Sequence, residues 1–463
     1  MRPPAVIVLF EDGRSCDGGS LRQALSADIF QRQKHYDLAG LFAQANAAST
    51  SVEPVLHNLL ALKSSLLRDL SAALFVIQTD PKAVTEMQVA PNIAPLLAKL
   101  APLVRIVENP DLDSELISRR TAVTTVAKAI VHRLYRFRRK PYVAGKAVVR
   151  AWVDVTLKMY PDEVENAQVR VFPFPLNRRR QKNFIDELKR RLIDWTRDGL
   201  PYRLSAMIGL LVAGSAHRHL AIAEFEGEAF AAFATEVARS RAGPVYTSDE
   251  FEVGAVEAGQ AFRILGVHYV NSAHGVGFYC PRTAYSHFRF LTNSQRDFYG
   301  RTSPQTQFVR RETSNFVLAR SSSPPQQRAS VIFVHQNFRS AGLLAEAYVE
   351  EQIISRLNGL KLPAHVSKYL KIHPNADPHV FARDLRGIEV ATTWGDIDVG
   401  RRLFLIINST AFYDLVGAGD VAVFKDVSFA PEIYLEGEYI HFNLQTLAPT
   451  IERWIKSHVC ETR

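Results

Sequence analysis

The segment ASVIFVHQ, Ala329 to Gln336, is a mostly apolar, β-branched run that ends on polar side chains. Such a run is typical of a strand buried on both faces of a parallel sheet. A helical pattern, AGLLAEAYVEEQIISRL (341–357), and a second strand pattern, HVSKYLKIHP (365–374), follow it. Strands that alternate with helices in this way predict a doubly wound parallel α/β sheet.

The same alternation continues towards the C-terminus. GIEVATT (387–393), RRLFLIIN (401–408) and DVAVF (420–424) have strand patterns, and STAFYDLVGAG (409–419) begins as a helix. The segment SSSPPQQR (321–328), just before this region, has no apolar residue and is typical of a linker. We therefore expect a C-terminal α/β domain over 329–445, followed by a helix over 446–463 that could cross back to the rest of the chain.

The N-terminal part also has strand and helix patterns, from which we expect a second α/β domain over 1–320. AVIVLF (5–10) has the pattern of a parallel strand buried on both faces, and ALFVIQT (73–79) and LVRIVEN (103–109) are two further candidates. Residues 118–160 mix apolar positions at helical spacing with many Arg and Lys, which predicts a basic helical insertion. Its densest part is HRLYRFRRK (132–140).

Length and composition limit the class of protein. A chain of 463 residues is too long for one typical domain. Its 47% hydrophobic and 22% charged residues are those of a globular protein. The net charge of +9 suits nucleic acid, phospholipid head groups or nucleotide-activated substrates, and it also suits a solubility role without any partner.

Cysteine usage and apolar runs indicate the compartment. Cys16, Cys280 and Cys460 are far apart and form no Cys-x-x-Cys, which predicts a reduced cytosolic protein without a zinc site. The apolar run at the N-terminus is too short for a signal peptide, and no run reaches transmembrane length. We expect a cytoplasmic protein that is soluble or peripheral.

Polar clusters follow the predicted strands of the C-terminal domain. In open α/β sheets, ligands bind beyond the carboxyl ends of the strands. The three clusters, none of them acidic, are His335-Gln336-Asn337, His373-Pro374 and Asn408-Ser409-Thr410. Clusters without a carboxylate favour an anionic ligand.

Two of these clusters have an alternative, purely structural reading. Ser409 and Thr410 open a predicted helix, whose N-terminal N–H groups could hold a phosphate, but the hydroxyls could simply cap the helix. Pro374 ends its strand and holds His373 extended, so that the ring could donate to a phosphate or ribose or could have no ligand.

The N-terminal part contains candidates for a general base. Asp249-Glu250 follows one predicted strand, His274-Gly275 follows the next, and Glu11-Asp12 with Gly13 follows the first. A carboxylate or histidine at such a position can take a proton from a hydroxyl. Asp249 and Glu250 could instead cap the helix that follows them.

The order of these motifs resembles bacterial surface-polysaccharide transferases of the GT-B type. These include capsule sialyl- and Kdo-transferases and teichoic-acid glycerophosphotransferases. KIHPNAD (371–377) is similar to their His-Pro motif, INSTAFYDLVGAG (407–419) to their Ser/Thr motif and SAHGVGFY (272–279) to their His-Gly segment. The resemblance spans roughly residues 244–424.

The resemblance implies two Rossmann-like doubly wound domains facing a cleft, with acceptor binding in the first and nucleotide binding in the second. It assigns the donor nucleotide to His373, Pro374, Ser409 and Thr410. Their strand-end neighbours Gln336, Asn337 and Asn408 complete the predicted donor site.

The resemblance leaves the base undecided. The glycerophosphotransferases use a histidine in a His-Gly context, which matches His274, our first candidate. The sialyltransferase type uses an acidic pair followed by glycine, which matches Glu11 and Asp12, though unusually early in the chain. Asp249 and Glu250 rank last because no glycine follows them.

The expected reaction is an inverting, metal-independent transfer from a nucleotide-activated sugar, with a CMP-sugar favoured, to a surface-polysaccharide or lipid-linked acceptor. No cofactor or metal is expected, because the Asp-x-Asp of GDIDVG (395–400) precedes a strand and has the pattern of a turn. A glycerophosphotransferase-type polymerase using a CDP-alditol and a basic nucleic-acid-binding protein are the alternatives. A nucleotide-sugar epimerase and a non-catalytic scaffold also stay open.

The basic segment HRLYRFRRK fits a contact with an anionic glycan or with the inner membrane face. Its aromatic residues lie between the cations, as in interfacial segments. The alternative is a helix face that is simply solvated.

Overall fold

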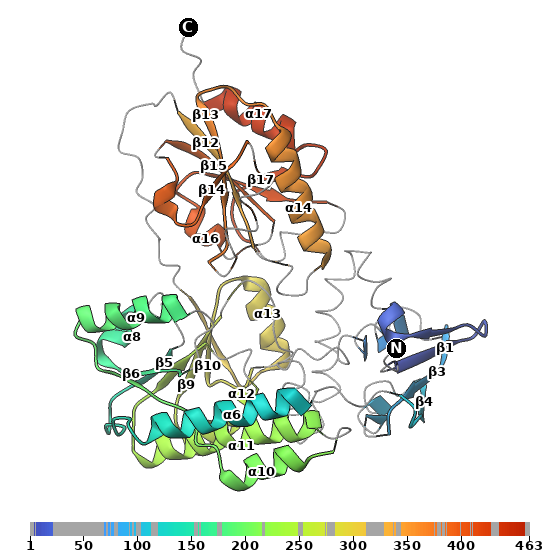
Figure 1. Cartoon of the computed structure of the whole chain (residues 1–463), viewed down its shortest axis with the longest axis vertical. Coiled ribbons are helices and arrows are strands. Elements are labelled where there is room, and N and C mark those ends of the chain that lie inside the picture. Colours follow the sequence, from blue (N-terminus) through green and yellow to red (C-terminus); the bar gives the residue numbers. More distant parts are fainter. Residues whose placement is uncertain are drawn as a thin grey trace. The chain divides into compact units, whose positions relative to one another are not determined.

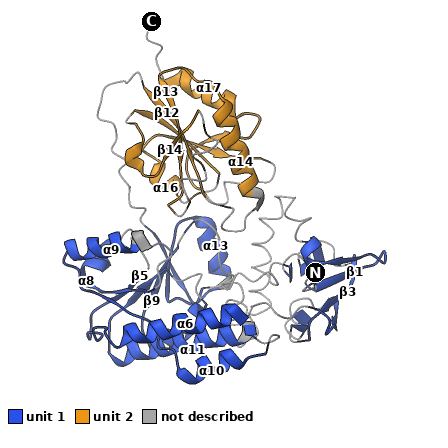
Figure 2. Cartoon of the chain, in the orientation of Figure 1, with its two compact units in different colours: residues 1–25, 32–311 blue, residues 26–31, 312–463 orange. Residues whose placement is uncertain are grey.

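The computed structural model describes residues 4, 6–21, 69–70, 73–74, 76–77, 82–91, 93–94, 97–98, 103–112, 119–151, 156, 159–173, 178–214, 218–248, 253–273, 275, 283–311, 328–336, 338, 344–374, 376, 381, 385, 387–398, 400–407, 409, 411–426 and 435–458. The chain divides into two compact units (Figure 2). The first comprises residues 1–25 and 32–311, and the second residues 26–31 and 312–463.

The second unit contains a six-stranded sheet in which every neighbouring pair is parallel. Its strands are β12 (Ala329–Val334), β13 (Val366–Lys371), β14 (Glu389–Ala391), β15 (Arg401–Ile406), β16 (Asp420–Phe424) and β17 (Ile440–Phe442). They lie in the order β14-β13-β12-β15-β16-β17. Counted from the first strand, this order is 3-2-1-4-5-6, that of the Rossmann fold.

Helices cover both faces of this sheet (Figure 1). They are α14 (Leu344–Gly359), the 3-10 turn η2 (Trp394–Asp396), α16 (Ala411–Leu415) and α17 (Leu447–His458). Leu403 and Leu405 of β15 join a buried cluster with α14 and α17, whereas the intervening Phe404 packs edge-on against Trp394 of η2. This alternation is the two-residue period of a strand buried on both sides.

The first unit contains a seven-stranded sheet, also parallel at every described pair. Its strands are β5 (Val148–Ala151), β6 (Gln168–Val171), β7 (Trp195–Arg197), β8 (Val245–Thr247), β9 (Tyr269–Ser272), β10 (His287–Phe290) and β11 (Gln307–Arg310). The order β11-β10-β9-β8-β5-β6-β7 is the Rossmann order extended by one strand. The predicted fold class, two Rossmann-like α/β domains, is therefore confirmed.

The helices of the first unit connect these strands. They are α6 (Arg119–Arg136), α8 (Pro161–Asn166), α9 (Arg178–Arg190), α10 (Leu204–Val212), α11 (Arg218–Arg239), α12 (Ala255–Ile264) and α13 (Asn293–Thr302). Helices α6, α10 and α11 pack on one another (Figure 1). The basic region 118–160 contains both α6 and β5, the strand with which the parallel sheet begins in sequence.

A third, four-stranded sheet corrects two predictions for the N-terminal region. Its strands β1 (Val6–Phe10), β2 (Ser15–Asp17), β3 (Val84–Val89) and β4 (Arg105–Glu108) lie in the order β2-β1-β3-β4. The prediction of a parallel strand for AVIVLF is wrong, because β1 is antiparallel to both neighbours: a tight turn after Phe10 returns the chain as β2, and the distant strand β3 pairs on the other side. ALFVIQT is also wrong as a strand: residues 73, 74, 76 and 77 are helical. The strand in LVRIVEN is confirmed as β4.

Among the described residues, no helix combines the length and apolar composition that crossing a bilayer requires.

Lys368 of β13 closes the C-terminal end of α14. Its ammonium group donates to the carbonyl oxygen of Leu357 in the last turn at 2.8 Å and to that of Leu360, just after the helix, at 2.6 Å. The Leu357 carbonyl also accepts the backbone N–H of Leu360 at 3.2 Å. We expect Lys368→Met to destabilise this end of α14 by about 1–2 kcal/mol. Hydrogen exchange of the last turn of α14 measures this, with the exposed Lys361→Met as a control expected to change little. Equal exchange in both variants would contradict the capping role.

Candidate functional site

The carboxyl ends of β12, β13 and β15 lie side by side at one edge of the C-terminal sheet. Strands β12 and β15 are the first and fourth strands, between which the order reverses and Rossmann sheets bind their ligands. Gln336, His373, Pro374 and Ser409 follow these three strands, so the structure brings these predicted residues to one edge. Asn337, Asn408 and Thr410 lie outside the described residues.

A buried pair, His335 and Glu350, organises this edge. His335 belongs to one of the predicted strand-end clusters, whereas Glu350 was not selected from the sequence. His335 follows β12, and its Nε2 lies 3.3 Å from Oε2 of Glu350 on α14. The backbone N–H of His373 points at Nδ1 of His335, at 3.4 Å. Because Nδ1 accepts, the proton of the neutral ring is on Nε2, directed at Glu350. One imidazole thus links the loops after β12 and β13 to helix α14.

Glu350 also shapes the loop that carries Gln336. Its Oε1 accepts the backbone N–H of Gln336 at 2.6 Å. Burial raises the pKa of Glu350 to about 7, although backbone N–H groups of Gln336 and Phe338 favour its ionised form. Burial, together with nearby His373, lowers the pKa of His335 to about 4. The ring therefore stays neutral at physiological pH.

This pair predicts an unusual pH dependence. In the folded chain the pKa is about 7 for Glu350 and about 4 for His335, whereas in the unfolded chain the values are 4.5 and 6.5. Between about pH 4.5 and 6.5, the pair therefore holds one titratable proton both in the folded and in the unfolded state. In the folded state the proton is on Glu350, and in the unfolded state it is on histidine. Equal proton counts make the pair's contribution to stability flat across this range.

Removing either partner should leave a stability that changes with pH, because the shifted pKa of the remaining partner is no longer compensated. In Glu350→Gln the lowered pKa of His335 contributes stability that is lost as pH falls from about 6.5 towards 4. In His335→Asn the raised pKa of Glu350 contributes stability that is lost as pH rises from about 4.5 through 7. Each slope is worth on the order of 3 kcal/mol in total. Denaturation of both variants across this range measures the slopes, and slopes of the same sign would contradict the pairing.

His373 and Pro374 begin a turn. The N–H of Ala376 donates to the carbonyl oxygen of His373 at 2.9 Å, which places Pro374 at the second position of a β-turn, where its fixed φ is favourable. The expected role of Pro374 in ending the strand region fits this geometry, because β13 ends at Lys371. The His373 side chain is half-buried at the sheet edge.

Ser409 acts as a cap. Its Oγ accepts the N–H of Ala411 at 3.0 Å, and its carbonyl oxygen accepts the N–H of Phe412. The capping alternative considered for this motif is thus present in the structure. A hydroxyl that accepts one bond can still donate its own proton, so capping leaves Ser409 able to meet an anion.

Lys371, a second residue that the sequence analysis did not select, is buried at the end of β13. Its ammonium group donates to the carbonyl oxygen of Ile372 at 2.9 Å and lies 5.2 Å from the ring centre of Trp394. Burial lowers the pKa of Lys371, and nearby Asp396 partly offsets this. Asp396 accepts hydrogen bonds from Thr393 and Thr392, and these bonds lower its pKa to about 2. The described start of GDIDVG, Gly395 and Asp396, belongs to the 3-10 turn η2.

The candidate base residues follow strands β8 and β9, which are neighbours in the seven-stranded sheet. Asp249, Glu250 and His274 themselves lie outside the described residues. The backbone on each side of His274 is anchored: Arg311 donates to the carbonyl oxygen of Ala273 at 3.0 Å, and buried Gln295 donates to that of Gly275 at 2.7 Å. Side chains from two other segments therefore position the chain that carries His274.

Glu11 and Asp12 occupy a different place. They form the exposed turn between β1 and β2, on the four-stranded sheet. Asp12 accepts the backbone N–H of Arg14 at 3.0 Å and its Nε at 2.6 Å, and these hydrogen bonds lower the pKa of Asp12. A lowered pKa makes Asp12 a weaker base, and neither residue follows a strand of a parallel sheet.

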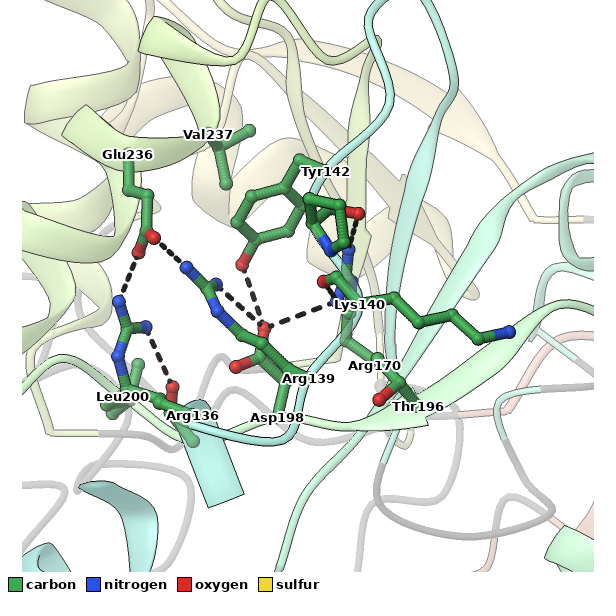
Figure 3. A network of polar contacts seen from close by, with 12 residues as sticks. Arg136, Arg139, Lys140, Tyr142, Arg170, Thr196, Asp198, Leu200, Glu236 and Val237 are labelled. Atoms are coloured by element: carbon green, nitrogen blue, oxygen red, sulfur yellow. Dashed lines mark hydrogen bonds and ion pairs between the residues drawn. The ribbon is translucent and has the colours of Figure 1, made fainter. Parts of the chain in front are cut away.

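Much of the basic segment HRLYRFRRK is paired inside the first unit (Figure 3). Arg136 bonds Glu236 at 2.6 Å, and Arg139 bonds Glu236 and Asp198. Lys140 donates to Asp194 at 2.7 Å. Several cations expected to face an acceptor or membrane are therefore neutralised by carboxylates, because α6 packs against α11 and the segment after β7.

Within the described part of the chain, no cluster of three or more His, Cys, Asp or Glu side chains could hold a metal ion.

Known proteins offer only distant comparisons. No protein-family model matches the sequence, and no curated protein matches it. Among solved structures, HepE of Anabaena in complex with UDP matches with a TM-score of 0.41 at 10% identity, over 68% of this chain and 92% of that chain. The glycosyltransferase SnogD from Streptomyces nogalater matches with 0.40 at 10% identity, over 68% and 91%. UDP-GlcNAc 2-epimerase from Neisseria meningitidis gives 0.40 at 10% identity, over 68% and 92%. We draw no functional conclusion from similarities this distant.

Proposed function

We propose that the chain is a glycosyltransferase that takes a sugar from a nucleotide-activated donor. The observation that carries this proposal is the edge of the C-terminal sheet. His373, Pro374, Gln336 and Ser409 follow three adjacent strands beside the point where the Rossmann order reverses. Hydrogen-bond donors at this position suit the phosphates and ribose of a nucleotide.

The donor side of the proposed site works by electrostatic stabilisation. The nucleotide leaves with negative charge on its phosphate, and His373 with the hydroxyls of Ser409 and Thr410 would donate to that charge. Gln336, Asn337 and Asn408 complete the proposed contacts to the nucleotide. The neutral His335 and the Glu350 carboxyl group hold these loops in place rather than touching the donor.

The acceptor side requires a base. We assign this role to His274, whose flanking carbonyl groups are held by Arg311 and Gln295. The imidazole takes the proton of an acceptor hydroxyl while the oxygen attacks the anomeric carbon from the face opposite the nucleotide, which inverts the configuration. Asp249 and Glu250 are the second choice. Asp12, whose carboxylate accepts hydrogen bonds from Arg14, and its neighbour Glu11 rank below them.

The finer parts of the proposal are a CMP-sugar donor, metal independence and a surface-polysaccharide or lipid-linked acceptor. The donor and acceptor classes are supported by the resemblance of the His-Pro and Ser/Thr motifs to those of the surface-polysaccharide transferases, and metal independence by the Asp-x-Asp of GDIDVG, which precedes a strand. A CDP-alditol donor is the second candidate, because a His-Gly context like that of His274 also suits attack on phosphorus.

Release of free nucleotide from a panel of CMP-, CDP-, UDP- and GDP-activated donors, with and without a metal chelator, tests this function. We expect release from one donor class with chelator present, and a loss of about 10²–10⁴-fold in His274→Ala. The control is His268→Ala, an exposed histidine that precedes the same strand, which should retain full activity. No release from any donor, or equal release by the His274 variant, would contradict the proposal.

A further inference from the structure

Helix α6 carries an apolar stripe that the unit does not bury. Val123, Ile130 and Leu134 are each about half exposed, and Phe137, just after the helix, is 80% exposed. At 100° per residue these four positions fall within an arc of about 60°. The buried positions of α6, among them Ala122 and Val126, lie on a neighbouring arc, so the stripe is a separate face.

Helix α10 packs on α6 (Figure 1), and its exposed side chains form a second stripe. It contains no charged residue, and it buries Met207 and Leu210. Its remaining large side chains, which are 44% to 76% exposed, are Leu204, Ile208, Leu211 and Val212. Two adjacent helices thus expose eight large apolar side chains, more than scattered surface residues explain.

The two helices are joined where α6 ends and α10 begins. Arg133 donates to the carbonyl oxygen of Tyr202 at 2.6 Å, and Arg136 donates to that of Gly199 at 3.2 Å. A hollow of about 380 Å³ lies at this junction. Its lining residues are Arg133, Arg136, Phe137, Arg139, Pro201, Tyr202 and Arg203. The end of the apolar stripe therefore borders a pocket lined by guanidinium groups.

The segment that contains α6 is strongly basic. No Asp or Glu occurs anywhere between Arg119 and Lys140, and the exposed Arg138 and Arg203 lie where α6 ends and α10 begins. The guanidinium groups of Figure 3 are paired with Asp198 and Glu236, and that of Arg170 is buried. The cations that remain available to an anion beside the apolar stripes are therefore the exposed Arg138 and Arg203.

We propose that the α6–α10 face docks on a bilayer that contains anionic phospholipids. The eight apolar side chains enter the boundary between head groups and acyl chains, and the exposed Arg138 and Arg203 meet lipid phosphates. A nucleic acid would use the cations but would leave the aliphatic stripe without a partner. A symmetric dimer through this face would bring the exposed Arg138 and Arg203 of both copies together, which like-charge repulsion disfavours.

Co-sedimentation of the full chain with vesicles tests the proposal without any nucleotide, so it is separate from the test of the transferase function. We expect binding to vesicles of phosphatidylglycerol in phosphatidylcholine, and weak binding to phosphatidylcholine alone. Ile208→Ser with Val212→Ser should reduce binding at least about tenfold, because two aliphatic side chains no longer enter the bilayer. Arg138→Gln with Arg203→Gln should reduce it only on anionic vesicles, and added salt should do the same.

Matched controls exclude a general surface effect. Ile264→Ser removes an 84% exposed isoleucine from α12, and Lys456→Gln removes an exposed charge from α17, and neither should change vesicle binding. Three results would overturn the proposal. These are no binding to anionic vesicles, binding to RNA or DNA that the arginine variants lose and the apolar variants keep, and a dimer that Ile208→Ser converts to monomer.

Discussion

Asp198→Ala is expected to destabilise the first unit by about 3–5 kcal/mol. Asp198 follows β7, is almost fully buried, and accepts from the Tyr142 hydroxyl at 3.0 Å and from Arg139 at 3.4 Å. Arg170 of β6 lies 3.9 Å away. Removing the carboxylate leaves two buried guanidinium groups with a reduced counter-charge and leaves the hydroxyl without its acceptor, which is the costly way to break a buried ion pair.

Hydrogen exchange of peptides from β6 and β7 measures this local free energy. Asp186→Ala, which removes an exposed carboxylate from α9, is the matched control and should change stability by less than about 0.5 kcal/mol. Tyr142→Phe removes one hydrogen bond and should cost about 1 kcal/mol. A cost below about 1 kcal/mol for Asp198→Ala would mean that the network of Figure 3 contributes little to the unit.

Gln295→Leu is expected to cost about 3 kcal/mol locally and to reduce nucleotide release at least tenfold. The Gln295 side chain is buried at the start of α13. It accepts the backbone N–H of Leu291 at 2.9 Å and donates to the carbonyl oxygen of Gly275 at 2.7 Å. Leucine fills a similar volume but makes neither bond, so the segment that carries His274 loses one of its two anchors.

The nucleotide affinity separates positioning from general damage. The proposed donor site belongs to the other unit, so Gln295→Leu should lower the rate of release at saturating donor and leave the Kd for the nucleotide unchanged. Arg296→Leu changes the next, exposed residue of the same helix and should affect neither quantity. Full activity in Gln295→Leu would contradict the role of this anchor.

The sequence predicts the C-terminal sheet well because its strands are continuous apolar runs with a single compatible environment. ASVIFV and RRLFLII are buried on both faces. Burial of both faces is typical of a central strand of a parallel sheet that has helices on each side. AVIVLF has the same local composition, yet β1 is antiparallel to both neighbours. Which strand pairs with which is decided by the turn after Phe10 and by distant partners, and these leave little trace in a short run.

Part of the candidate site was predictable for a similar reason. Proline after a strand and serine before a helix have local backbone roles, so His373-Pro374 and Ser409 could be found from the sequence. Glu350 was not selected because it lies within a helix, and only the packing of α14 on β12 brings it to His335. His335 and Glu350 are neighbours in space but are 15 residues apart in the sequence, and no known motif has this spacing.

The most direct test of the central claim is nucleotide binding by the wild type and His373→Ala. A thermal-shift panel of CMP, CDP, UDP, GDP and ADP serves, because a ligand that binds only the folded state raises its apparent stability by mass action. His441→Ala, an exposed histidine on β17 of the same unit, is the control. We predict a shift with a pyrimidine nucleotide, CMP or CDP first, that His373→Ala loses and His441→Ala keeps. No shift with any nucleotide, or a shift that His373→Ala leaves intact, would contradict a donor site at this edge of the sheet.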